Sequence, residues 1–317
     1  MLPIAVALVC FIRFAYLLRP VEYSRADETV HLMQCRGLSA VGPHHTATPM
    51  RQGYFLLGRL CMGVTDYLSR WRPLSAYSGL VLLSTLSGCV TCVSWGRDWR
   101  VALAIGSSPL LLGLGRRALS DVPLVAVQCL AVVAAPHYPW VSAGMVVLAL
   151  WVKESSFSAL PGLALWVHLA GGPWWPFVVG AVAWLACPMN RWEHLRWLLP
   201  HNVRRVPNAY AARFCLGGWL RLVVDLCMMS APAAGYAVWT HDPRGLAVAV
   251  ILAWYGCPWL HQQIRSCLVV DVLLRVMAAP IWPLIVVIDL YVWYRVYWRG
   301  QVYDPAHADI AAALGFM

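Results

Sequence analysis

Long apolar runs alternate with short polar segments along most of the chain. The runs are about 13 to 24 residues long and are bounded by charged residues, proline or glycine, as membrane-spanning segments are. They cover residues 2–18, 77–95, 101–114, 122–135, 140–152, 157–169, 173–186, 216–239 and 246–260, with one or two more between 267 and 294. No alternating strand pattern accompanies them, and a chain inside a bilayer must pair its own backbone groups. The pattern predicts an all-α integral membrane protein with about ten or eleven transmembrane helices.

Two connections between the runs are long. In the first, "ADETVHLMQCRGLSAV" from residue 26 and "MRQGYFLLGRLCMGVTDYL" from residue 50 have the mixed polarity of amphipathic helices at a membrane interface. The second connection, residues 187–213, combines Trp192 and Trp197 with arginines and favours a helix at headgroup level. No separate soluble domain, linker or internal repeat is evident, so we expect residues 1–317 to form a single polytopic domain.

Composition supports this interpretation and limits the kinds of partner that the protein can bind. The chain is 61% hydrophobic and 12% charged, which requires the bilayer as its solvent. Its net charge is +10, but the arginines are scattered between apolar runs and form no basic face, which argues against nucleic-acid binding. A membrane surface or a phosphate-bearing lipid is the better partner for such charge. Lys153 is the only lysine in the sequence.

The 11 cysteines lie mostly inside apolar runs, where cysteine behaves as a small hydrophobic residue. Cys89 and Cys92 have the spacing of a redox or zinc motif, but no second pair accompanies them. Cys35 and Cys61 both fall in the first long connection and can pair if that connection faces an oxidising compartment.

Charged residues from four connections share one membrane face when crossings are counted. Asp27 and Glu28 follow the first run directly. Each pair of crossings returns the chain to their side, and the residues brought there are Arg116, Arg117, Asp121, Lys153, Glu154, Arg204 and Arg205. For any one connection, solvated charge is the simpler explanation, and Asp121 is equally placed to cap the helix that Pro123 opens. As a set, ionisable groups at this depth are typical of a cavity lining.

Two further charge pairs lie inside later apolar runs. Arg221 with Asp225, and Asp271 with Arg275, have the spacing that places both members on one helix face. Each pair can neutralise itself as a structural contact, and the alternative is the lining of a groove for a lipid.

The order of the polar motifs resembles that of the GT-C superfamily of polytopic glycosyltransferases, which includes protein O-mannosyltransferases and aminoarabinose transferases. The similar stretches are "ADETVH" after the first run, "TPMRQGYFLLGRL", "RRALSDVPL" and "LWVKESSFSALPGLALWV". They cover about the first 170 residues, so the resemblance implies a catalytic core over residues 1–170 and additional membrane helices and a tail over residues 171–317. The chain differs from most members in being shorter and in lacking a lysine in the first connection.

The resemblance implies inverting transfer of a sugar from a polyprenyl-phosphate donor to a hydroxyl or amine of a lipid, glycan or protein acceptor. The catalytic residues implied are Asp27 as base, Glu28 as second choice or acceptor-orienting group, and Asp121. The residues implied for the lipid phosphate are Arg51, Arg116, Arg117, Lys153, Arg204 and Arg205. No cofactor is required, although a divalent cation (Mg²⁺ or Mn²⁺) on Asp27 and Asp121 would suit a pyrophosphate donor.

The same resemblance places the site on the outer or lumenal face of a plasma, inner or endoplasmic-reticulum membrane. Arginine-rich connections favour the cytoplasmic face by the positive-inside rule, but anionic lipid phosphates supply another reason for arginine there. Two alternatives remain open. One is a transporter or lipid flippase, which broken helices around a midplane site would favour. The other is an inactive scaffold related to these enzymes.

Overall fold

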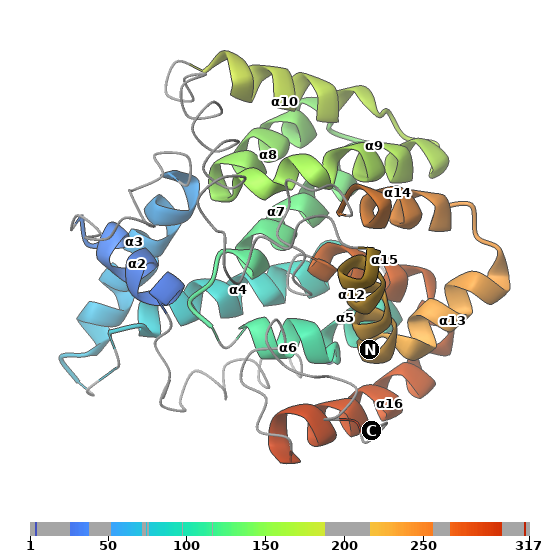
Figure 1. The fold of residues 1–317 in the computed structure, drawn as a ribbon. Helices are drawn as coiled ribbons and strands as arrows, with labels where there is room; N and C mark the ends of the chain where they lie inside the picture. Colours follow the sequence, from blue (N-terminus) through green and yellow to red (C-terminus); the bar gives the residue numbers. More distant parts are fainter. Residues whose placement is uncertain are drawn as a thin grey trace.

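The structure is a computed structural model, and it describes residues 26–37, 52–71, 74, 76–96, 98–115, 117–187, 216–255 and 267–299, with the single positions 4 and 314. Every regular element in these ranges is helical, which confirms the predicted all-α class (Figure 1). The predicted span at residues 2–18 and the predicted headgroup helix at residues 187–213 lie almost wholly outside the described residues.

Most of the described helices fall within the predicted runs. In chain order they are α2 (Ala26–Cys35), α3 (Gln52–Leu68), α4 (Ser78–Ser94), α5 (Trp99–Gly106), α6 (Pro109–Gly115), α7 (Asp121–Ala134), α8 (Pro139–Val152), α9 (Leu160–Leu169), α10 (Trp175–Ala186), α12 (Leu216–Met229), α13 (Ala231–Thr240), α14 (Gly245–Tyr255), α15 (Leu268–Met277) and α16 (Trp282–Trp293). Short 3₁₀ turns occupy Glu154–Ser158 and Ala279–Ile281, and a π-helical turn occupies Tyr294–Arg299.

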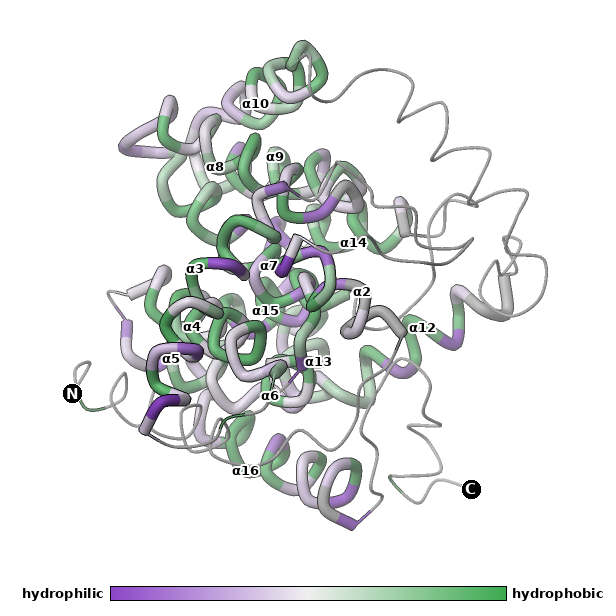
Figure 2. The backbone as a smooth tube through the Cα atoms, turned by 90° about the vertical axis from the view of Figure 1, so that its left-hand side faces the viewer, coloured by the Kyte–Doolittle hydropathy of each residue, from purple (hydrophilic) through white to green (hydrophobic). Residues whose placement is uncertain are grey.

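Helix α7 lies at the centre of the described fold. It packs against α4 on one side and α8 on the other, and α8 in turn packs against α10 (Figure 1). Its side chains from Asp121 to Cys129 are buried, as expected for a helix that is apolar on all sides. Long hydrophobic stretches also mark α8 and α10 in Figure 2. The amino-terminal end of α7, where Asp121 lies, is therefore enclosed by its neighbours.

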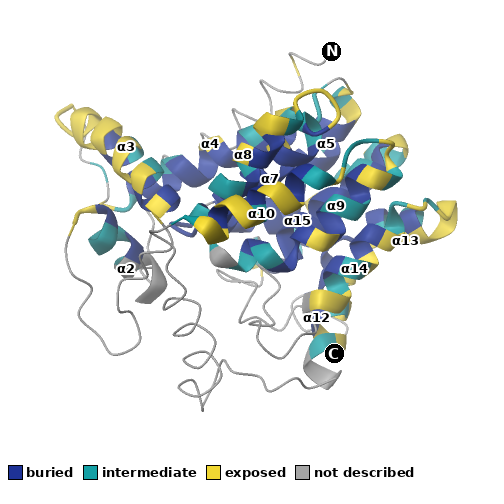
Figure 3. Ribbon diagram, turned by 90° about the horizontal axis from the view of Figure 1, so that it is seen from above, coloured by how far each residue is buried: buried dark blue, intermediate teal, exposed yellow. Residues whose placement is uncertain are grey.

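Helices α2 and α3 form a separate lobe beside this body, and the outer end of α3 is exposed (Figure 3). Helix α3 packs on α4, and α2 packs on α3. The crossing of α3 and α4 is close: a Cβ atom at Gly79 would lie 2.6 Å from the Cα atom of Met62, so only glycine fits there. The two helices predicted in the first connection are thus present.

One predicted span is divided in two. Residues 101–114 form α5 and α6, which meet at Ser107 and Ser108. Pro109 follows, and proline disfavours the helical conformation in the residue before it. The hydroxyl groups of both serines bond to aspartates of other helices rather than to their own helix alone.

A second predicted span, residues 216–239, is also broken. Its two halves, α12 and α13, meet at Ser230 and differ in direction by 98°. Pro232, at the second position of α13, cannot donate the hydrogen bond that would continue α12.

Most of the described helices are short relative to a bilayer. Within the described ranges, only Ala279–Tyr297, at 19 residues, is both long and apolar enough to cross a membrane by itself. The bent pair α12 and α13 meets the criterion only when joined, and six other apolar helices have 10–17 residues. At 1.5 Å per residue, such helices are shorter than a hydrocarbon core of about 30 Å. The number of spans therefore stays a prediction.

Candidate functional site

The segment between α6 and α7 meets the α2–α3 lobe at the carbonyl group of Ala118. The hydroxyl of Tyr54 donates to the Ala118 carbonyl oxygen at 3.2 Å, and Nδ1 of His31 lies 3.1 Å from the same oxygen. Because a carbonyl oxygen only accepts, His31 must carry its proton on Nδ1 in this contact. The His31 and Tyr54 rings also meet edge to face, with centroids 4.9 Å apart. These contacts join the lobe to the amino-terminal end of α7.

Helix α4 holds the same segment from another side. The Ser84 hydroxyl donates to the Arg117 carbonyl oxygen at 2.8 Å and lies 3.3 Å from that of Leu119. The side chains of Arg117 and Ser120 are buried. The segment is thus fixed by side chains from three helices, although it has no regular structure of its own.

Asp121 and Lys153 form an ion pair at the end of this segment. Lys153 Nζ lies 2.6 Å from Asp121 Oδ1, and the two side chains are only 12% and 4% exposed. Asp121 is the first residue of α7, whereas Lys153 directly follows α8 in an extended conformation. Ser120 occupies the cap position of α7 without a side-chain cap hydrogen bond, and Asp121 is the acidic residue of the first turn. The carboxylate of Asp121 pairs with the lone lysine.

A second polar contact fixes the turn that carries Lys153. Gln128 Nε2 donates to the Ser156 hydroxyl at 3.0 Å, two helical turns along α7 from Asp121. Both residues are buried. The turn after α8 is therefore bonded to α7 at two positions along that helix.

Asp27 and Glu28 belong to the first turn of α2, and their side chains lie outside the described residues. The position of their helix is nevertheless defined by contacts of two other residues. Thr29 Oγ1 lies 3.1 Å from the Tyr77 hydroxyl, and His31, one turn after Asp27, contacts Ala118. His31 had no role in the sequence-based prediction, which lacked any signal that its partner would be a distant carbonyl group.

Four predicted phosphate-binding residues, Arg51, Arg116, Arg204 and Arg205, lie outside the described residues. The structure therefore brings together Arg117, Asp121 and Lys153 with the helix of Asp27 and Glu28. No group of three His, Cys, Asp or Glu side chains suited to a metal ion occurs in the described part of the chain. The ammonium group of Lys153 beside Asp121 disfavours a cation at that carboxylate, and the side chain of Asp27, the other ligand considered, lies outside the described residues.

A buried ionic cluster lies in another part of the body. The predicted pair of Asp271 and Arg275 is present at 2.7 Å, and Arg275 also binds Asp289. All three side chains are at most 1% exposed. The serines at the two helix breaks complete the cluster: Ser108 donates to Asp271 at 2.5 Å, Ser230 donates to the same carboxylate, and Ser107 donates to Asp289 at 2.7 Å.

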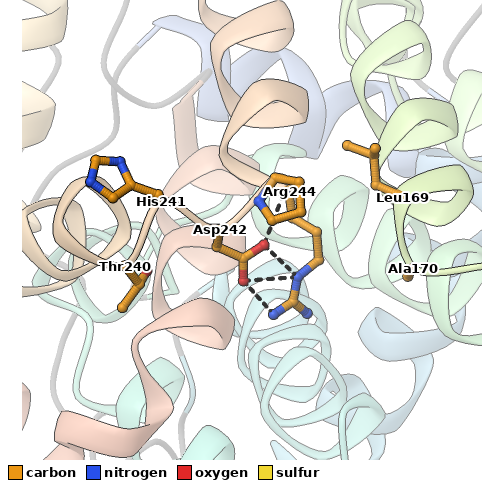
Figure 4. A pocket seen from close by; sticks show the side chains of 7 residues that line it. Leu169, Ala170, Thr240, His241, Asp242 and Arg244 are labelled. Carbon is orange, nitrogen blue, oxygen red and sulfur yellow. Dashed lines mark hydrogen bonds and ion pairs between the residues drawn. The ribbon is translucent and has the colours of Figure 1, made fainter.

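An open pocket of about 550 Å³ lies between the end of α9 and the turn from α13 to α14 (Figure 4). Arg244 NH2 lies 2.6 Å from Asp242 Oδ2 in this turn, and the guanidinium also lies over Trp166, 5.2 Å from the ring centroid. The hydrogen bonds from Arg244 lower the pKa of Asp242 below its usual value, against a smaller opposing effect of burial. The two charges neutralise each other, so the pocket gathers no unbalanced charge from this pair.

Comparison with models of protein families, with curated protein sequences and with solved structures finds no match to this chain.

Proposed function

We propose that this protein is a membrane-embedded glycosyltransferase that moves a sugar from a polyprenyl-phosphate donor to a hydroxyl or amine acceptor. The observation that supports it best is the contact of α2 with the segment ending at Asp121. His31 and Tyr54 meet Ala118, and Asp121 holds Lys153, so acidic and basic groups from separate parts of the sequence gather at one end of α7.

The chemistry divides among these residues as follows. Asp27 takes the proton of the acceptor as its oxygen or nitrogen attacks the anomeric carbon, with Glu28 orienting the acceptor. The bond from that carbon to the phosphate oxygen breaks, and its electrons leave with the polyprenyl phosphate. Lys153 and the arginines offset the phosphate charge. Asp121 acts as a positioning residue, because it fixes Lys153 rather than facing the substrate itself.

A bilayer setting is supported by apolar faces that remain exposed in the described fold. On α16, Leu284, Val287 and Leu290 are each more than half exposed and follow one another at helical spacing. Helix α10 exposes Val178 and Val182 one turn apart. Contiguous apolar faces of this kind suit contact with lipid. We propose an integral membrane location, with the site on the outer or lumenal face.

The test compares sugar transfer by the wild-type chain and by Asp27→Asn in isolated membranes, using a panel of radiolabelled polyprenyl-phosphate sugars. Loss of the base is expected to reduce the rate by about 10²- to 10⁴-fold. Asp66→Asn is the matched control, because Asp66 is an exposed aspartate on α3 that lies 3.9 Å from the partly exposed Arg36. Undiminished transfer by Asp27→Asn would refute the base assignment, and absence of transfer by the wild type with every donor would refute the enzyme.

A transporter or lipid flippase is the second candidate, and the buried ionic cluster favours it. Two broken helices direct Ser108 and Ser230 toward Asp271, as discontinuous helices do around substrate sites in transporters. Reconstituted vesicles distinguish the two functions. Movement of a fluorescent polyprenyl-phosphate lipid across the bilayer without any sugar transfer would favour the transporter.

A further inference from the structure

Helices α2 and α3 each bring a cysteine to the place where they cross. Cys35 is the last residue of α2 and is 3% exposed, whereas Cys61 lies half-buried on α3. The Cys35 sulfur rests on Gly58: a Cβ atom built at Gly58 would lie 2.7 Å from it. Gly58 and Cys61 are one helical turn apart, so the sulfur of Cys35 approaches the part of α3 that carries the second thiol.

The backbone at this crossing is already held in place. Arg59 Nε donates to the Cys35 carbonyl oxygen at 2.9 Å, which fixes the end of α2 against α3. A disulfide needs Cβ atoms about 3.5–4.5 Å apart, and a glycine at the crossing lets the two helices approach that closely. Both cysteines are thiols in the structure.

We propose that Cys35 and Cys61 form a disulfide that fastens α2, the helix of Asp27 and Glu28, to α3. The bond would fasten the carboxyl-terminal end of α2 and so help to hold this helix, with Asp27 and Glu28 in its first turn, beside the segment at Ala118, whether or not sugar transfer is the activity. It requires that this lobe face a compartment in which disulfides persist, as the outer and lumenal faces do.

The bond forms by exchange with an oxidised partner, either glutathione disulfide or a protein disulfide. The thiolate of Cys61, which is the more exposed, attacks one sulfur of the partner and releases the other as a thiolate. The thiolate of Cys35 then attacks Cys61 in the mixed disulfide and releases the second partner sulfur. Two electrons and two protons pass to the partner, which leaves as two thiols.

The environment of both thiols makes the bond slow to form and slow to break. Burial raises the pKa of Cys35 to about 12 despite the nearby charge of Arg59, and burial also raises the pKa of Cys61. Few thiolates are then present near neutral pH, and thiolates are the reactive form. These properties suit a structural fastening made during folding, and they do not suit a fast redox sensor.

The test maps cysteines in the full-length chain. Membranes are quenched with acid, free thiols are blocked with N-ethylmaleimide, and digested peptides are identified by mass spectrometry. We expect a peptide linking Cys35 to Cys61 that is lost after reduction with dithiothreitol, when both residues gain the alkyl group. Cys35→Ser and Cys61→Ser should each abolish the linked peptide. Cys227→Ser, a change at an exposed cysteine of α12, should leave it unchanged.

A second experiment tests the proposal if the cysteines of this lobe remain reduced in the membranes used. The protein is solubilised in mild detergent and equilibrated with glutathione disulfide, with modification of Cys187, which directly follows α10, as the sign that the reagent works. Formation of the linked peptide supports the proposal. Full alkylation of both Cys35 and Cys61, or linkage of either to a different cysteine, overturns it. Because Cys61 is half-buried, Cys61→Ser is the variant expected to fold even if Cys35→Ser does not.

Discussion

Lys153 Nζ lies 2.6 Å from Asp121 Oδ1, and this contact joins the only lysine of the chain to the first residue of the central helix. The two residues are 32 positions apart and belong to different helix ends. Both side chains are largely withdrawn from solvent. The pair therefore fixes the turn after α8 to the start of α7, and it sets the position of a positive charge beside the α2 lobe.

Removing one partner of this pair should destabilise the protein more than removing both. Asp121→Asn leaves the buried ammonium without its counter-charge, and the expected cost is about 3–5 kcal/mol in the free energy of unfolding. Lys153→Met should cost a similar amount, whereas the double variant Asp121→Asn with Lys153→Met should recover part of the loss. Denaturant unfolding in detergent measures the coupling. Strictly additive effects of the two changes would contradict a direct pairing.

Loss of one hydrogen bond to the Ala118 carbonyl oxygen should lower the unfolding free energy by a smaller amount, with a more local effect. Tyr54→Phe removes one donor to it while His31 remains, so we expect a loss of about 1 kcal/mol in unfolding free energy. Tyr67→Phe is the matched control, because Tyr67 lies on the same helix and is 58% exposed. If the lobe contact also orients α2 for catalysis, Tyr54→Phe should lower the sugar-transfer rate and Tyr67→Phe should not. Equal effects of the two changes on stability would show that the Ala118 contact contributes nothing.

The buried cluster around Arg275 should be the least tolerant place in the described fold. Arg275→Met leaves the carboxylates of Asp271 and Asp289 buried without a cation, so a loss of at least about 3–5 kcal/mol is expected, enough to prevent folding of a marginal protein. Size-exclusion profiles of a fluorescent fusion in detergent would report the loss of folded protein.

Arg221→Met is the control for that experiment. Its pair with Asp225 has the same helical spacing, but the two atoms are 3.9 Å apart and the arginine side chain is 61% exposed. Exposed pairs of this type contribute at most about 1 kcal/mol, so the folded fraction should change little. A normal profile for Arg275→Met would mean that the cluster does not support the fold.

The sequence predicts most helices well because apolar runs and their polar boundaries are local features. The amino-terminal start of α2 at Ala26 and the start of α3 at Gln52 were both expected from mixed-polarity segments. The breaks at Ser107, Ser108 and Ser230 were not expected, because a serine inside an apolar run is common in an unbroken helix. Pro109 and Pro232 favour the breaks locally, whereas the bonds that hold them are non-local: each serine hydroxyl bonds to an aspartate more than 40 positions away.

The candidate site was predictable in part for the same reason. Counting crossings placed Asp121 and Lys153 on one face with Asp27, and the pairing of the first two agrees with that placement. That count assumed that residues 101–114 form one span, whereas the structure divides them. The contact of His31 with Ala118 is independent evidence that these parts of the chain lie close together, because it joins α2 directly to the segment before α7. Asp289 was missed as a partner of Arg275 because the turn Ala279–Ile281, which contains Pro280, separates their helices and no spacing rule applies across such a break.

The turn between α13 and α14 should make the unfolding free energy depend on pH with a definite sign. Hydrogen bonds from Arg244 lower the pKa of Asp242 in the folded protein, whereas the unfolded chain should have the ordinary value of about 3.9. The unfolded state therefore binds the proton first as the pH falls. The stabilisation is complete above the unfolded pKa and is lost as the pH falls through the folded pKa. The difference in unfolding free energy between the wild type and Asp242→Asn should thus be constant near neutral pH and shrink in acid.

Arg244→Met should remove this dependence, because the carboxyl group then has no cation in the turn. Denaturant unfolding of the three proteins in detergent over an acidic pH series provides the measurement, and a wild-type advantage that persists unchanged below the folded pKa would contradict the assigned role of the pair.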